Sequence, residues 1–449
     1  MTPGSLFDED QPGEDGASSS PSAEAPRVGA KRVRHAVRDQ VEFQEFALND
    51  LLCEDDEARI VWEFVCGLDL SELSARIQAV EQGPGQAPAD PRILLALWLY
   101  ATLRGVGSAR EVNRLCRKHI AYRWLCGGVS MNYHTLADFR TAHVDLLDRL
   151  LTHSAATLMA AGLVTLDRVA QDGMKVRASA GAASFRRQPT LDEALAKSEE
   201  QVRQLKQELE TDPSAARTRR QAARERAAAE RSSRIQAALE QLPGIAAAKK
   251  AKDRENARAS TTDADARVMK MADGGYRPAY NVQFATTVGS QIITGVEVTN
   301  SGGDQGKMAP MVRQHVQRYG KPPKEALIDG GFFKKADFDE VSAGGTTVYC
   351  PVMESKDANR DPHTPRDDDS PVVAQWRQRM ATDDAKAIYK DRASTAECVN
   401  ALARNRGLYQ FRVRGLLKVK AVALLYALAH NLMRAVTLGQ ETALNAATS

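Results

Sequence analysis

The chain lacks the features that define several common protein classes. Its six cysteines form no C-x-x-C pair, and no Cys/His group has zinc-finger spacing. The most apolar run, AVALLYALA at 421–429, is far shorter than the roughly 20 residues that span a bilayer. The first residues show no basic-then-apolar signal pattern. We therefore expect reduced thiols, no membrane partner and a cytoplasmic protein.

Charge is nearly balanced over the whole chain but unevenly distributed along it. The net charge is +3, which by itself favours no class of partner. Residues 1–30 are rich in acids, Ser, Pro and Gly, and carry a single base, Arg27. Such a composition buries too little apolar surface to order itself. The basic patch KRVRHAVR follows, so we predict a disordered acidic tail and basic arm over residues 1–41.

Residues 42–160 show the apolar spacing of helices. The clearest segments are IVWEFVCGL, PRILLALWLYATLRG and LLDRLLTHSAATLMAAG. Between them, the basic segment 108–128 is followed by a second short helical pattern, TLADFRTAHVDLL. This tandem suits helix-turn-helix DNA binding, with Arg114, Arg117 and Lys118 as candidate contacts. It suits a plain helical bundle with a solvated basic face equally well.

Strand patterns begin after residue 160. Two short strands are predicted within 164–178, and a hairpin over 278–300 with a two-residue turn at Gly289-Ser290. A helix ending at Gly320 follows, and then two buried strands, EALIDGGF and TTVYCPV. Hairpins and a helix both connect these strands, which predicts a mixed sheet of the α+β or α/β class.

Residues 188–256 interrupt this sheet with a segment of helix-forming residues. Its apolar positions recur at alternating spacings of four and three, which is the pattern of a coiled-coil seam. Asp212-Pro213 breaks the first helix, and Pro243-Gly244 is expected to end the second. We predict an antiparallel helical hairpin inserted into the sheet domain. The pattern does not decide whether this insertion dimerises or contacts DNA.

Three acids stand out within this framework. Asp172 and Asp329 each follow a buried strand pattern and precede a glycine that allows the backbone to turn. The ordinary function of such an aspartate is turn formation. Glu397 lies on a helix ending at Gly407, in a polar stripe with Tyr389, Asn400 and Arg404. If the three carboxylates converge, they suit hard divalent cations and metal-dependent phosphodiester chemistry.

These blocks resemble bacterial insertion-sequence transposases of the DDE class, over about residues 45–438. QDGMKVRASAG is similar to the block with the first aspartate of that family, and ALIDGGF to the block with the second. TTDADARVMK with GGYRPAYNVQ resembles its hairpin block. The spacing Tyr389-x2-Arg392-x4-Glu397-x6-Arg404 resembles its tyrosine–arginine–glutamate–lysine signature, with arginine in place of the final lysine.

The resemblance implies a catalytic site and its ligands. Asp172, Asp329 and Glu397 would be the catalytic residues and would bind two Mg²⁺ ions, with Mn²⁺ as a substitute. The implied contacts to the transposon-end strand are Tyr389, Arg392 and Arg404, with Lys175 and Arg177 as further candidates. Asp304 corresponds to an additional acidic position seen in relatives. The resemblance also favours DNA binding for the N-terminal helices.

The expected architecture is multidomain. A helical DNA-binding domain spans 42–160, and a ribonuclease-H-like catalytic domain spans 161–187 and 257–438. The coiled-coil insertion occupies 188–256, and a tail occupies 439–449. The implied function is a transposase that binds inverted-repeat ends and target DNA as a dimer or higher assembly. The alternatives are a structure-specific nuclease of the same fold and a catalytically silent DNA-binding regulator.

Overall fold

The computed structural model describes residues 45–77, 87–211, 219–354 and 360–448. Contacts within the chain separate residues 1–46 from residues 47–449, and the fold described below is that of the second unit. The predicted acidic tail and basic arm lie outside the described residues.

The first part of this unit is helical, as predicted. Its helices are α1 (Glu57–Cys66), α2 (Ser71–Ala75), α3 (Pro91–Leu103), α4 (Ala109–Lys118), α5 (Ile120–Cys126), α6 (Tyr133–Ala142) and α7 (Val144–Ala160), after a 3-10 turn at Leu48–Leu51. Helix α3 is buried on nearly every side, with Pro91 in its first turn. The basic segment 108–128 is not one helix, because His119 accepts a hydrogen bond from the Ala121 amide and starts α5.

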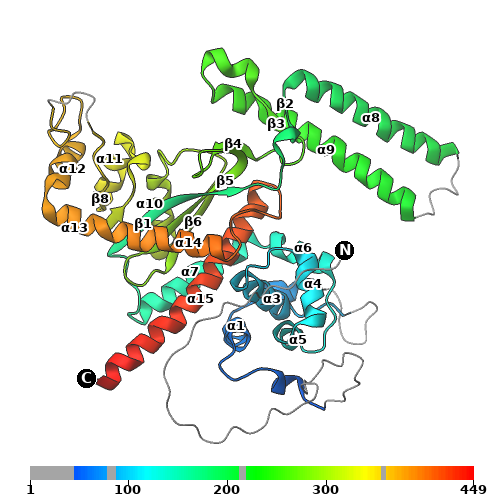
Figure 1. Ribbon diagram of the computed structural model, residues 1–449, viewed down its shortest axis with the longest axis horizontal. Coiled ribbons are helices and arrows are strands. Elements are labelled where there is room, and N and C mark those ends of the chain that lie inside the picture. The colour runs from blue at the N-terminus through cyan, green and yellow to red at the C-terminus, as the bar shows by residue number, and fades with distance from the viewer. Residues whose placement is uncertain (1–44, 78–86, 212–218, 355–359, 449) are drawn as a thin grey trace, which may run out of the picture. The chain divides into compact units, whose positions relative to one another are not determined.

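The last helix joins this helical region to the sheet. Helix α15 (Leu416–Thr448) packs against α3, α6, α7 and the strand β6 (Ile293–Thr299), so one hydrophobic core continues from the helices into the sheet (Figure 1). Its segment 416–440 could span a membrane by length and mean hydropathy, but 61% of the most apolar window is buried inside the protein. Helix α15 continues into the segment expected to be a tail, as far as Thr448, where helix-forming Ala, Leu, Gln and Glu are frequent. The expected division into domains stays a prediction.

The sheet has six strands and is mixed, as expected. The strands are β1 (Arg168–Arg177), β4 (Arg267–Lys270), β5 (Tyr276–Thr287), β6, β7 (Glu325–Leu327) and β8 (Thr347–Tyr349). Their order is β4-β5-β1-β7-β8, with β6 paired to β5. Strands β1, β5, β4 and β6 pair antiparallel, whereas β1, β7 and β8 pair parallel.

Two local predictions about strands are corrected. Residues 164–178 contain one strand rather than two, because β1 pairs with β5 without interruption from Val169 to Arg177. Asp172 therefore lies inside a strand and not at its end. The β5–β6 hairpin is confirmed, but its turn spans 288–291, where Gly289 and Gln291 both have positive φ.

Helices flank the sheet and carry the third acid. They are α10 (Met308–Tyr319), α11 (Lys335–Ala343), α12 (Pro371–Ala381), α13 (Asp383–Arg392) and α14 (Cys398–Asn405). A π-helical turn, Ala393–Glu397, joins α13 to α14. Helix α13, the π turn and α14 form one continuous helical rod (Figure 1). The π turn in it contacts the central strands β1 and β5.

The insertion forms the predicted helical hairpin. Helices α8 (Gln188–Thr211) and α9 (Arg219–Ala247) pack along each other, and their root is a short two-stranded sheet of β2 (Phe185–Arg186) and β3 (Ala259–Ser260) (Figure 1). Leu191, Ile235 and Leu242 are buried between the helices. The predicted break at 212–213 lies outside the described residues. The predicted end at Pro243 is wrong, because this proline costs α9 one backbone hydrogen bond without ending it.

Candidate active site

The first two acids come from neighbouring parallel strands. Ala170 of β1 pairs with Leu327 of β7. Asp172 and Asp329 each lie two residues further along, at the edge where β7 has ended and β1 continues. The Gly331 amide donates a 2.8 Å hydrogen bond to Asp329 Oδ1, which fixes the turn after β7. Adjacent parallel strands thus bring together two carboxylates that are far apart in the sequence.

The π turn positions the third acid. Arg392 and Glu397 are five residues apart, and in a regular α-helix such residues point about 140° away from each other. Here the wider turn of Ala393–Glu397 brings them together, and Arg392 Nη1 lies 3.1 Å from Glu397 Oε1. The sequence analysis placed the polar stripe on one helix face by assuming α-helical spacing throughout. In the structure, Glu397 faces Arg392 because a single π turn is inserted, a feature frequent at functional sites.

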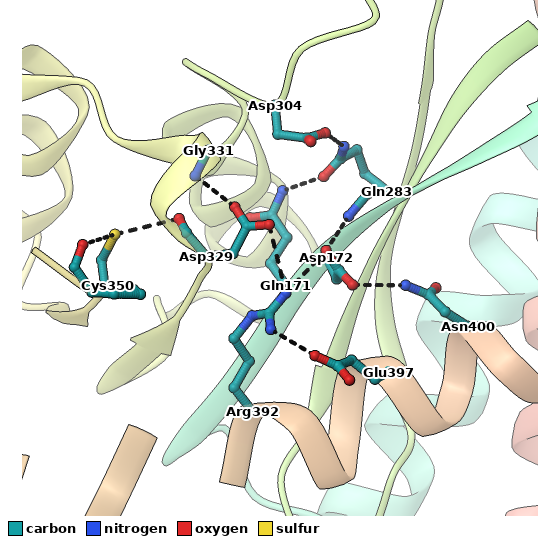
Figure 2. A network of polar contacts seen from close by, with 12 residues as sticks. Gln171, Asp172, Gln283, Asp304, Asp329, Gly331, Cys350, Arg392, Glu397 and Asn400 are labelled. Atoms are coloured by element: carbon teal, nitrogen blue, oxygen red, sulfur yellow. Dashed lines mark hydrogen bonds and ion pairs between the residues drawn. The ribbon is translucent and has the colours of Figure 1, made fainter. Parts of the chain in front are cut away.

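The three carboxylates converge on the Arg392 guanidinium. Its Nη2 lies 3.2 Å from Asp172 Oδ1 and 3.7 Å from Asp329 Oδ2, while Nη1 bonds Glu397 (Figure 2). The Arg392 side chain is only 10% exposed. Burial lowers the pKa of this arginine, but the surrounding carboxylates and Tyr389 together raise it above its usual value. Arg392, predicted to contact DNA, thus serves in this arrangement as the counter-ion of all three acids.

Asp172 is the most strongly enclosed of the three. Burial raises its pKa above the usual value, with the negative charges of Asp329 and Asp304 acting in the same direction and Arg392 opposing them. The Asn400 amide donates a 3.0 Å hydrogen bond to Asp172 Oδ2, and the Gly173 amide donates a 2.9 Å bond to Oδ1. Asn400 was visible in the sequence only as a member of the polar stripe. The carboxylate is therefore held in one orientation before any ligand arrives.

A fourth acid, Asp304, approaches the same strand. Its Oδ1 accepts hydrogen bonds from the side-chain amides of Asn281 and Gln283, at 2.7 Å and 2.6 Å. This approach requires glycine at 173, since a Cβ there would lie 2.3 Å from Asp304 Oδ1 and 2.4 Å from Gln283 Nε2. The glycine after Asp172 therefore makes room across the strand rather than allowing a turn. Two amides that the sequence analysis missed, Asn281 and Gln283, hold this acid.

A basic groove begins beside these acids. It has a volume of about 540 Å³ and is lined by three predicted DNA contacts, Lys175, Arg177 and Arg404. The sequence analysis did not identify three further members, Lys270, Arg277 and the exposed Tyr409. Arg277 is paired at 2.8 Å with Asp273, an acid that also lines the groove. Gly173 also lines it, so the groove adjoins the carboxylates. Cations and an exposed aromatic ring in one groove suit a nucleic-acid strand.

The remaining predicted DNA contacts lie outside this groove, three of them on α4 and one near Arg392. Arg114, Arg117 and Lys118 are on α4, and Arg114 pairs with Glu111 of the same helix. Tyr389, at the end of α13, is half-buried near Arg392, and burial raises its pKa to about 12. The structure thus gathers the three predicted catalytic acids with Tyr389, Arg392 and the groove, and leaves the α4 cations outside this cluster.

The donor chemistry of the cluster fits a divalent cation. Asp172, Asp304, Asp329 and Glu397 supply only carboxylate oxygens, the ligands that Mg²⁺ prefers. The single positive charge of Arg392 cannot neutralise four carboxylates, so the group keeps an excess of negative charge. In the arrangement described, however, no three His, Cys, Asp or Glu side chains among the described residues are gathered closely enough to hold an ion. Arg392 lies between them, so a metal would take over the position of its guanidinium.

Comparison with known families matches two separate segments. A family described as transposase DDE domain matches residues 350–436, which include Tyr389, Arg392, Glu397 and Arg404 but neither of the two aspartates predicted to be catalytic. A family described as transposase domain (DUF772) matches residues 46–142, the helical region that contains α4. No curated protein and no solved structure matches the chain. Both matched families are transposase families, and together they support an insertion-sequence transposase, an enzyme that acts on DNA.

Proposed function

We propose that this chain is a DNA transposase that binds the inverted-repeat ends of an insertion sequence, cuts them, and joins them to target DNA. The observation that carries the proposal is the convergence of Asp172, Asp329 and Glu397, from two strands and a helix, on one buried guanidinium. Four antiparallel strands, the short β4 among them, are followed by two parallel ones in a sheet crossed by helices, and this order supports a ribonuclease-H-like catalytic domain. The matched transposase families support the same function.

In this proposal the three acids hold two Mg²⁺ ions, or Mn²⁺ in their place. Bound there, the metal would supply charge that activates water and stabilises the leaving oxygen of a phosphodiester. The protein itself orients Asp172 through Asn400 and the Gly173 amide. Water attacks the phosphorus at the transposon end and releases a 3′-hydroxyl, which then attacks a target phosphodiester. No covalent intermediate with the protein and no ATP is needed.

The cations around the site would hold the DNA. Lys175, Arg177 and Arg404 line the groove beside Asp172 and would contact the phosphates of the transposon-end strand. Arg392 and Tyr389 would reach the same strand once a metal has replaced the guanidinium. The basic helix α4 would contact the inverted repeat. Because two ends must be brought together, we propose a homodimer or higher assembly that works on the bacterial nucleoid in the cytoplasm.

The test is incubation with Mg²⁺ and labelled DNA that carries both ends of the element, whose sequence should flank the gene. We expect nicks at the ends, followed by products joined to a second DNA. Nicking without joining would indicate the structure-specific nuclease. Binding of the ends without nicking, in Mg²⁺ and Mn²⁺ alike, would indicate the silent regulator and contradict the proposal.

A further inference from the structure

The root of the helical insertion carries a second basic groove. It has a volume of about 810 Å³ and lies between α8, α9 and the loop before α15. Its cations are Arg186, Lys197, Arg231, Arg234 and Arg414. Of the described residues that line it, one is an acid, Glu193, and it is already paired with Lys197 at 3.0 Å. Within the described ranges none of the four arginines forms a salt bridge, so the groove holds uncompensated positive charge.

Strand pairing and a hydroxyl contact hold the two chain segments at the root together. Phe185 of β2 pairs with Ser260 of β3, and the hydroxyls of Ser184 and Ser260 lie 2.7 Å apart. Arg231 and Arg234 are three residues apart on α9, so their side chains share one face. A groove of guanidiniums without carboxylate partners suits a ligand that presents a regular row of negative charges.

This groove is connected to the groove beside the catalytic acids. The Arg177 amide donates to Tyr409 O at 3.0 Å, and the Phe411 amide donates to Arg177 O at 2.8 Å. Two residues beyond Arg177, the Arg414 side chain donates to Ser179 O at 3.2 Å. The end of strand β1 and the residues just after it therefore run beside segment 409–414, whose Tyr409 lines the first groove and whose Arg414 lines the second. Asp172 to Arg177 alone spans about 17 Å of strand, roughly five base pairs of duplex.

We propose that the insertion root is a DNA-backbone-binding surface, and that it extends the contact of the catalytic domain along the duplex away from the cut. The inference rests on the proposed function and assigns a role to the insertion. Phosphate contacts by Arg186, Arg231, Arg234 and Arg414 would position the duplex without reading its sequence. The unpaired charge favours this role over dimerisation of the hairpins through the same face.

The experiment compares two double variants of the full chain. Arg231→Gln with Arg234→Gln removes two charges from the groove, while Arg224→Gln with Arg226→Gln removes two exposed charges from the same helix outside it. Binding to a fluorescent duplex is measured by anisotropy at several KCl concentrations. We expect the groove variant to reduce the slope of log affinity against log salt by about 1.8, and the control to keep the wild-type slope.

The melting temperature of each variant is measured as well, to check that both variants are folded. An unchanged slope in the groove variant, or an equal loss in the control, would overturn the inference. If the wild-type chain cuts DNA while the groove variant keeps its slope, only the role of the insertion is wrong. If the wild-type chain does not bind DNA at all, the proposed function fails with it.

Discussion

Replacing Asp172 with asparagine is expected to abolish DNA cleavage while the chain stays folded. The amide preserves the shape of the side chain but removes the negative charge that the metal needs. Metal ions contribute several kcal/mol to phosphodiester cleavage, and each factor of ten corresponds to about 1.4 kcal/mol, so we expect a loss of about 1,000-fold or more. The rate of nicking of labelled end DNA in Mg²⁺ measures this effect.

Stability distinguishes this loss from unfolding. Burial raises the pKa of Asp172 above 3.8, so its contribution to stability is complete below pH 3.8 and is lost as the pH rises through the raised pKa. Burying the charged carboxylate at neutral pH costs free energy of folding, and asparagine carries no charge to bury. The variant should therefore unfold at neutral pH at a denaturant concentration no lower than that of the wild type. The control is Asp167→Asn, an exposed acid paired with Lys324. Substantial nicking by Asp172→Asn would contradict the site.

Replacing Arg392 with glutamine is expected to destabilise the chain when metal is absent. The change removes the cation that, among the residues the structure describes, Asp172, Asp329 and Glu397 share. Breaking a buried ion pair costs about 3–5 kcal/mol, but Asp329 and Glu397 are 38% and 60% exposed, so we expect a loss of about 1–3 kcal/mol at pH 7. Urea unfolding with and without Mn²⁺ measures this loss.

The pH and metal dependence of this variant follow from the charges. Without Arg392 the pKa of Asp172 rises further, so the lost stability should return as the pH falls and the acid is protonated. Mn²⁺ should restore more stability to Arg392→Gln than it adds to wild type, because no guanidinium competes for the carboxylates. The control is Arg404→Gln, an exposed residue further along the same helical rod. If both variants are equally stable and equally indifferent to Mn²⁺, Arg392 is not the counter-ion of the site.

Much of the fold could be predicted from periodicity. The N-terminal helices, the β5–β6 hairpin, helix α10 ending at Gly320 and the inserted helical hairpin all follow from local patterns that tertiary packing does not override. The errors are local. Asp172-Gly173 was interpreted as a strand end because Asp and Gly often form turns, but pairing with β5 keeps the strand intact.

The identity of the three acids could be predicted, but their arrangement could not. Family resemblance connected Asp172, Asp329 and Glu397, whereas no local pattern relates residues so far apart in the sequence. The position of Arg392 depends on the π turn, which has no sequence signal comparable to a helix cap. The roles of Asn281, Gln283 and Asn400 depend on which face of a strand or helix meets the others, and this is decided by packing.

The central claim is that Asp172, Asp329 and Glu397 form one divalent metal site. Its most direct test is titration of the full-length chain with Mn²⁺, with free ion followed by electron paramagnetic resonance. We predict saturable binding to wild type that weakens about tenfold or more in each of Asp172→Asn, Asp329→Asn and Glu397→Gln, while Asp167→Asn binds as wild type does. Mn²⁺ binding that is unchanged in all three variants would contradict the claim.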